Sequence, residues 1–166
     1  PCEEVQQLRL LTRRRKAYTE RITQCKHEIH NILQRANIKL TSYLSDIYGI
    51  TGITLLEMFI DGEVITEQTI LPKIHGKVKA TAAELVEAMD GKLSFEDRFL
   101  LGQSLEHYRH SVNQVEEITV VIKQYVLDRF EREYNLLIEL PGVSAIIACV
   151  ILSEIGPNLE AFQSQG

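Results

Sequence analysis

Residues 136–157 read LLIELPGVSAIIACVILSEIGP, and this stretch decides the fold. A helical run ends just before Pro141-Gly142, a pair that favours a tight turn. Ser144 can then cap a second, largely apolar helix over residues 145–155, because its hydroxyl can accept a backbone N–H. Gly156-Pro157 is the expected stop signal. The stretch therefore predicts helix, hairpin, helix. The second helix is too short to span a bilayer, so it must pack against other parts of the protein.

Two interpretations of this hairpin remain open. The simpler one is a buried helix that follows a tight turn. The functional one is a helix-hairpin-helix motif, in which backbone N–H groups of the hairpin contact a nucleic-acid phosphate at a helix N-terminus. That motif usually reads glycine, apolar residue, glycine, whereas this chain has Gly142, Val143 and Ser144. Gly142 and Ser144 are therefore candidate phosphate contacts in a hairpin that lacks the second glycine.

The composition favours a helical protein that is not secreted. Of the 166 residues, 45% are apolar, Trp is absent and only 7% are aromatic, which is more typical of helical folds than of sandwiches. The three cysteines are far apart and odd in number, so they indicate a reducing compartment without a disulfide framework. No apolar run reaches transmembrane length, and no signal peptide is visible. We therefore expect a cytoplasmic protein that does not enter a membrane.

Charge is distributed unevenly along the chain. The net charge is −5, yet residues 1–39 hold nine Lys or Arg against four Glu and so carry +5, which leaves −10 for the remainder. This asymmetry indicates an acidic partner for the N-terminal part. The candidate contacts for nucleic-acid phosphates are Arg13, Arg14, Arg15, Lys16, Arg21 and Lys26. A solvated basic surface is the alternative interpretation. Arg13–Lys16 are four consecutive residues, so they surround the helix.

Two long segments have apolar residues at seven-residue spacing. Residues 3–37 contain no Gly or Pro and carry two such series, while Ser94 can cap a helix that continues to about residue 139. Several short helices are expected between them. The predicted fold class is all-α: two long heptad-patterned helices in a coiled-coil hairpin, short intervening helices, and a C-terminal helix-hairpin-helix-like segment. Such apolar seams also predict a homo-oligomer.

The sequence shows no arrangement typical of a catalytic site. His27 with His30, and His107 with His110, are spaced to share a helix face, but neither pair has a third ligand at a recognisable spacing. Neither a phosphate-binding glycine loop nor a pair of carboxylates in a strand-end context is present. Ser144 is expected to be a helix cap, because no strand leads into it. We therefore expect no catalytic residue, metal site or cofactor in this chain.

Four segments together resemble one known family. They are LRLLTRRRKAYTERITQCKHEIHNILQRANIKL at residues 8–40, TSYLSDIYGITGITLLEMFIDGE at 41–63, GKLSFEDRFLL at 91–101, and LPGVSAIIACVILSEIGP at 140–157 with Phe162 after it. In this combination the chain closely resembles the central part of insertion-sequence transposases of the IS-one-ten type, the bridge-RNA-guided recombinases. The resemblance covers essentially the whole chain.

The resemblance implies a division of labour within a larger enzyme. That family has a RuvC-like domain whose four acidic residues bind magnesium, then a coiled-coil region, then a transposase domain with a serine nucleophile. By resemblance, residues 1–39 leave the RuvC-like domain as the first coiled-coil helix. Residues 40–93 connect it to the second long helix at 94–139, and residues 140–166 open the transposase domain. The catalytic residues and the magnesium then belong to the parent enzyme, outside this chain.

The implied function is assembly and nucleic-acid positioning in a transposase that recombines DNA. DNA, and in this family a guide RNA, are the implied partners, in the cytoplasm of a bacterial or archaeal cell. The alternative from the residues alone is a helical coiled-coil dimerisation module of a non-catalytic scaffold or signalling protein. That alternative explains the heptads, but it does not explain why a basic helix occurs together with the hairpin.

Overall fold

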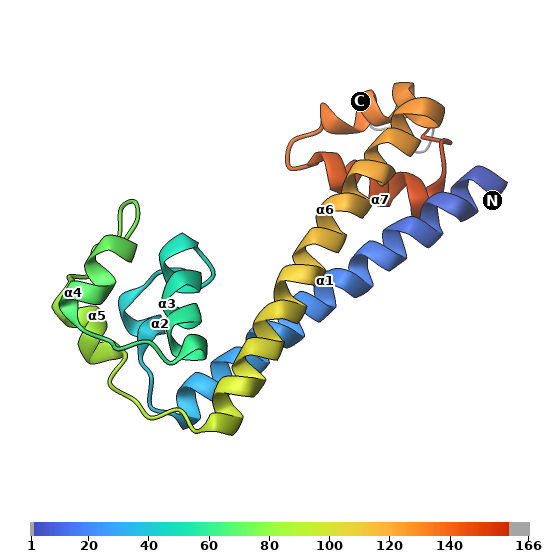
Figure 1. Ribbon diagram of the computed structural model, residues 1–166. Coiled ribbons are helices and arrows are strands. Elements are labelled where there is room, and N and C mark those ends of the chain that lie inside the picture. Colours follow the sequence, from blue (N-terminus) through green and yellow to red (C-terminus); the bar gives the residue numbers. More distant parts are fainter. Residues whose placement is uncertain (1, 160–166) are drawn as a thin grey trace. The chain divides into compact units, whose positions relative to one another are not determined.

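A computed structural model of the chain describes residues 2–159, so Phe162 lies outside the described residues. Every regular element in that range is helical, which confirms the all-α prediction (Figure 1). The elements in order are α1 (Glu3–Arg35), α2 (Leu40–Tyr43), α3 (Ile50–Asp61), α4 (Glu67–Ile70), a 3₁₀ turn (Leu71–Lys73), α5 (Ala82–Ala88), α6 (Phe95–Ile138) and α7 (Ala145–Ile155). None of these helices is both long enough and apolar enough to cross a bilayer.

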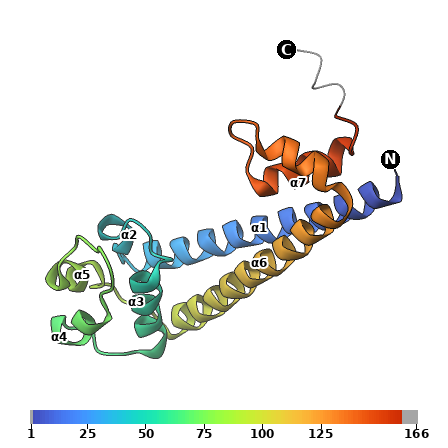
Figure 2. The same cartoon turned by 90° about the horizontal axis from the view of Figure 1, so that it is seen from above.

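The chain divides into two compact units. Unit 1 consists of Pro1–Thr23 and Arg109–Gly166, and unit 2 is Gln24–Tyr108. The long helices α1 and α6 each contribute one part to each unit (Figures 1 and 2). Each unit has its own apolar core, so each is described by itself below.

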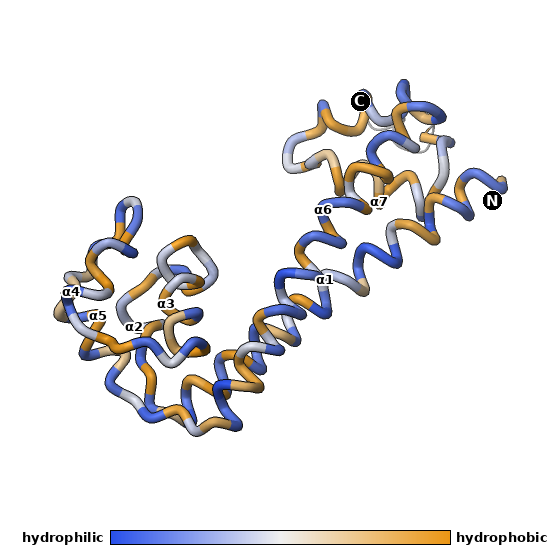
Figure 3. Tube along the Cα trace, in the orientation of Figure 1, coloured by the Kyte–Doolittle hydropathy of each residue, from blue (hydrophilic) through white to orange (hydrophobic). Residues whose placement is uncertain are grey.

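The core of unit 1 gathers side chains from the start of α1, the second half of α6 and α7. Its buried members are Val5, Leu8, Ile122, Val126, Phe130, Tyr134, Leu137, Ala148, Cys149, Leu152 and Leu159. The expectation that this apolar helix packs against other parts of the protein is thereby confirmed, since α7 folds back on the long helices within unit 1. Figure 3 shows α7 as a mostly hydrophobic stretch.

Only one face of α7 is buried, although nearly all of its residues are apolar. Ala148, Cys149 and Leu152 are buried, whereas Ile147 and Val150 remain 43% and 42% exposed. Because successive side chains of an α-helix are rotated by about 100°, a single packed face cannot cover all the apolar residues of such a helix. Burial of α7 therefore depends on the face of Leu152 and not on Ile147.

The helix α6 is interrupted at Phe130, although its sequence predicts a continuous helix. Phe130 has φ −136° and ψ 31°, outside the helical region. No Gly or Pro causes this break, so nothing in the local sequence announces it. Phe130, Tyr134 and Leu137 are all buried in the unit 1 core. Tertiary packing therefore takes precedence over the local helical preference at this position.

Unit 2 packs the end of α1 and the start of α6 with the short helices. Its core includes Ile29, Leu33, Leu55, Leu56, Met58, Ile70, Leu85, Leu101 and Leu105. Two polar contacts join the long helices here: Arg35 Nη2 lies 2.7 Å from Asp97 Oδ1, and Ser104 Oγ donates to Glu28 Oε2 over 3.0 Å. Since the later α1 residue pairs with the earlier α6 residue, the two helices are antiparallel here, as expected for a hairpin of two long helices.

Candidate nucleic-acid interface

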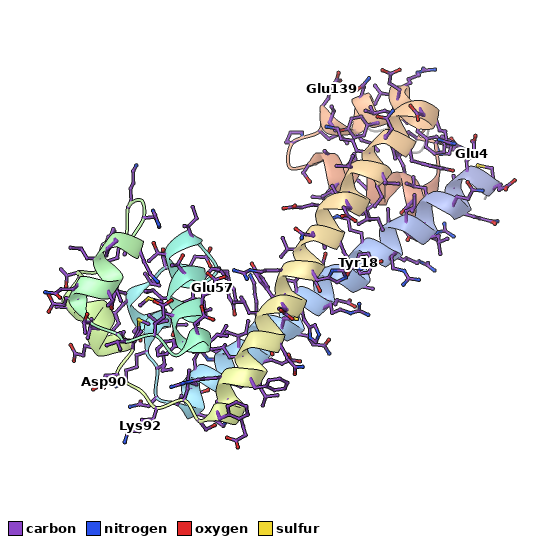
Figure 4. All side chains as sticks on the ribbon, in the orientation of Figure 1. Glu4, Tyr18, Glu57, Asp90, Lys92 and Glu139 are labelled. Atoms are coloured by element: carbon purple, nitrogen blue, oxygen red, sulfur yellow. The ribbon has the colours of Figure 1, made fainter. Side chains whose placement is uncertain are left out.

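The basic block of α1 presents three of its four cations on the outer side of unit 1. Arg13, Arg14 and Lys16 are exposed, and Arg21 joins them two turns later. At about 100° per residue, Arg14 and Arg21 are separated by only about 20° around the helix axis. Arg13 lies roughly 80–100° to one side of them, and Lys16 lies roughly 60° further in the same direction. These four residues, called the basic face below, extend roughly 12 Å along the helix axis. Figure 4 labels Tyr18, which lies within this stretch of α1.

Arg15, the fourth cation of the block, does not belong to the basic face. Its guanidinium Nε donates a hydrogen bond to Thr119 Oγ1 on α6 over 2.8 Å. Thr119 in turn donates to the Val115 carbonyl of its own helix. Arg15 occupies a position in the heptad seam, and a hydroxyl of the neighbouring helix supplies its polar partner.

Lys26 lies in unit 2, in an aromatic environment. Its Nζ is 4.8 Å from the centre of the Tyr48 ring and 5.9 Å from that of Tyr108, distances at which a cation–π interaction forms. The Tyr48 hydroxyl also donates to the Lys26 carbonyl over 3.2 Å. Burial, followed by the nearby Tyr108 and Asp46, raises the pKa of Tyr48 to about 12. Lys26 therefore has a packing role within unit 2.

Two members of the basic face have carboxylate neighbours. Lys16 Nζ lies 3.9 Å from Glu20 Oε1 on the same helix, and Arg13 Nε lies 4.0 Å from Glu154 Oε1 on α7. Within residues 2–159, neither Arg14 nor Arg21 forms an ion pair. These two guanidinium groups are therefore the cations of the face most available to an external anion.

Arg9 is a residue that the sequence analysis did not single out. It donates from Nε to the Ser153 carbonyl and from Nη2 to the Glu154 carbonyl, each over 3.0 Å. Both acceptors lie in the last turn of α7, where the helix dipole favours a cation. Thr12, one turn later on α1, donates to the buried Ser153 hydroxyl over 3.1 Å. No sequence signal identifies these contacts, because they join residues more than 140 positions apart.

The hairpin before α7 has the local geometry that its sequence predicts. Val143 N–H donates to the Leu140 carbonyl over 3.1 Å, and Gly142 between them has φ +82°. This positive φ is readily adopted only by glycine. Ser144 caps α7 by accepting the N–H of Ile147 over 3.4 Å.

Within the described residues, no hydrogen bond or ion pair joins the hairpin to the basic face. Arg9 and Arg13 contact the C-terminal turn of α7, through Ser153 and Glu154. The hairpin precedes the first residue of this 11-residue helix, and the two ends of such a helix are roughly 15 Å apart. Gly142 and Ser144 are therefore not linked to the four cations by any such contact.

Among residues 2–159, no three His, Cys, Asp or Glu side chains gather as a metal-binding group, so the magnesium implied for the parent enzyme finds no matching ligand set there. Burial raises the pKa of the Cys149 thiol, and His27, His30, His107 and His110 are all exposed. The arrangement can bind anions through the basic face of α1.

No family model, curated protein or solved structure matches this chain. The resemblance to insertion-sequence transposases therefore rests on the sequence motifs alone.

Proposed function

We propose that this chain positions nucleic acid within a DNA recombinase, and that the basic face of α1 holds the sugar–phosphate backbone. The observation that carries the proposal is the pair Arg14 and Arg21, which are exposed on one side of α1 and form no ion pair within the described residues. Guanidinium groups suit phosphate oxygens because their fork of N–H donors can bind two oxygens at once.

The proposed binding is weak and tolerant of sequence. Contacts to phosphates carry no base information, so a helix that offers only these contacts fixes register and orientation. If all four cations of the basic face neutralise phosphates, log affinity falls with log salt at a slope of roughly −3.6. The net charge of −5 opposes accumulation of polyanions elsewhere on the chain, which keeps the affinity modest.

The recombinase context comes from the transposase-like motifs, and it assigns the chemistry to other parts of the parent enzyme. In that context the magnesium-dependent steps and the serine nucleophile lie outside this chain. The chain contributes a long antiparallel helix pair for assembly and the basic face for DNA or guide RNA. It has no catalytic activity of its own in this proposal.

Charge reversal tests the proposal. Arg14→Glu with Arg21→Glu should weaken binding to duplexes of unrelated sequence by similar factors, as measured by fluorescence anisotropy in low salt. Lys77→Glu with Lys92→Glu is the matched control with the same total change of charge, because both lysines are exposed cations of unit 2 and Figure 4 labels Lys92. The control should leave affinity nearly unchanged. Equal losses in both variants would show a general charge effect and would remove the basic face from the proposal.

A second candidate function, self-assembly through helices, is favoured by a different observation. Several apolar side chains of α6 are strongly exposed, among them Phe95 at 79%, Phe99 at 57% and Val120 at 70%. Phe95 and Phe99 lie one helical turn apart, so they can form a contiguous apolar patch of the kind that marks association surfaces. Light scattering at tens of micromolar should show a dimer or larger species, and Phe95→Ser with Phe99→Ser should reduce it. A strict monomer before mutation would exclude this candidate.

A further inference from the structure

The end of α7 supplies an anion to the basic side of α1. Glu154 lies 3.6 Å from Arg9 Nε and 4.0 Å from Arg13 Nε, measured to its two different carboxylate oxygens. The Ser153 and Glu154 carbonyls accept the two hydrogen bonds from Arg9. Residues 9, 12 and 13 of α1, spaced to share one side of that helix, therefore each contact residue 153, residue 154 or both.

We propose that Glu154 is an internal competitor for nucleic-acid phosphate, so that Arg13 becomes fully available only when Glu154 is displaced. This inference rests on the proposed function, and it names a regulation of that same basic face.

The two arginines differ in how they would respond to a phosphate. Arg9 has a side chain that is only 26% exposed and is held by two carbonyls of α7, so it remains bound to that helix. Arg13 has a side chain that is 68% exposed, and its partner Glu154 lies 4.0 Å away. An exposed ion pair at such a distance is worth little, so a phosphate with better geometry can replace the carboxylate.

Competition at Arg13 couples nucleic-acid binding to the docking of α7. When a phosphate takes Arg13, the end of α7 loses one of its contacts to α1 and keeps those from Arg9 and Thr12. By linkage, the factor by which bound nucleic acid weakens the contact between Glu154 and Arg13 equals the factor by which that contact weakens nucleic-acid binding. Arg14 is not among the residues that contact Glu154, so it provides a control position one residue away.

A double-mutant cycle on the full chain tests the inference, with a short DNA duplex as the probe. Affinity is measured for the unmodified chain, Arg13→Gln, Glu154→Gln and the double variant, and the same cycle is run with Arg14→Gln. Arg13→Gln should cost about two- to fivefold more affinity in the Glu154→Gln background than alone, because a neutral amide at position 154 no longer competes for that cation. Arg14→Gln should cost the same factor in both backgrounds.

Each outcome has a defined meaning. An equal loss for Arg13→Gln in both backgrounds overturns the competition while leaving the proposed function intact. An equal background effect on Arg13→Gln and Arg14→Gln also overturns it, since the effect of Glu154 would then be general electrostatics. If no variant binds the duplex at low salt, both the inference and the proposed function are wrong. Circular dichroism of each variant confirms that it is folded.

Discussion

Arg15 Nε donates a hydrogen bond to Thr119 Oγ1 over 2.8 Å, joining α1 to α6 within unit 1. This one contact removes Arg15 from a run of four consecutive cations and places it between the two helices. The three remaining cations of the run, with Arg21, form the basic face. Of the four consecutive cations, Arg15 therefore has a structural role, while Arg13, Arg14 and Lys16 face solvent.

Mutation of Arg15 should change the stability of the protein, whereas mutation of Arg14 should change its affinity for duplex DNA. Arg15→Gln should lower the free energy of unfolding by about 1.5–3 kcal/mol, because it removes a hydrogen bond from a charged donor in a half-buried position. Its effect on duplex affinity should be small. Arg14→Gln should weaken duplex binding and leave the thermal midpoint unchanged. Denaturant melts and anisotropy on both variants test this, and a loss of affinity for both with no change in stability would contradict it.

Leu152 and Ile147 differ in burial, and so they should differ in the cost of substitution. Leu152→Ala should destabilise unit 1 by about 2–5 kcal/mol, since Leu152 is fully buried in its core. Ile147→Asp should be tolerated, because Ile147 is 43% exposed and an acidic residue in the first turn of α7 complements the helix dipole. Urea unfolding followed by circular dichroism would measure both. A larger loss for Ile147→Asp than for Leu152→Ala would mean that the packed face of α7 is assigned wrongly.

Ser144 should act as a helix cap and nothing more. Ser144→Ala should cost about 1 kcal/mol, the usual loss when a capping hydroxyl is removed, and Ser144→Asp should restore most of it. Thermal melts in neutral buffer give the comparison. If Ser144→Ala is neutral for stability but abolishes duplex binding, Ser144 contacts nucleic acid directly. The helix-hairpin-helix interpretation of this segment would then be correct.

Tyr48 should make the stability of unit 2 depend on alkaline pH. Its pKa is raised to about 12 in the folded chain, mainly by burial, while the ordinary value is 10.0. The unfolded chain therefore loses this proton first, so stability should fall as pH rises from about 10 toward 12. Tyr48→Phe should remove that part of the decline while keeping the ring beside Lys26. Melting midpoints measured across this pH range give the decline for the unmodified chain and for Tyr48→Phe. An equal decline of the midpoint with pH in both proteins would show that Tyr48 is not the group responsible.

Much of the fold follows from the sequence, because heptad spacing and helix caps are local signals. Leu101 and Leu105, two apolar residues of the second heptad-patterned segment, are buried, and the Ser144 cap and the Gly142 turn occur where the pattern indicates. The break at Phe130 was not predictable in the same way. Its local sequence is compatible with helix, and its conformation accompanies burial in a core assembled from distant segments.

The candidate site was predictable only as a set of residue types. The sequence identified the cations Arg13 to Arg21, but their directions depend on how α1 packs against α6, as the contact of Arg15 shows. Lys26 was grouped with them, whereas in the structure it lies against the rings of Tyr48 and Tyr108. Arg9 was not identified, since its acceptors on α7 are brought to it only by the tertiary fold.

The salt dependence of duplex binding tests the central claim most directly. Dissociation constants measured by anisotropy between low and physiological salt should give a log–log slope of roughly −3.6 for the unmodified chain, and the Arg14→Gln, Arg21→Gln variant should reduce its magnitude to roughly 1.8. The same reduction should appear for duplexes of different sequence, because only phosphates are contacted. A slope that is unchanged in the variant, or binding that does not depend on salt, would contradict the assignment of the basic face of α1 as the nucleic-acid interface.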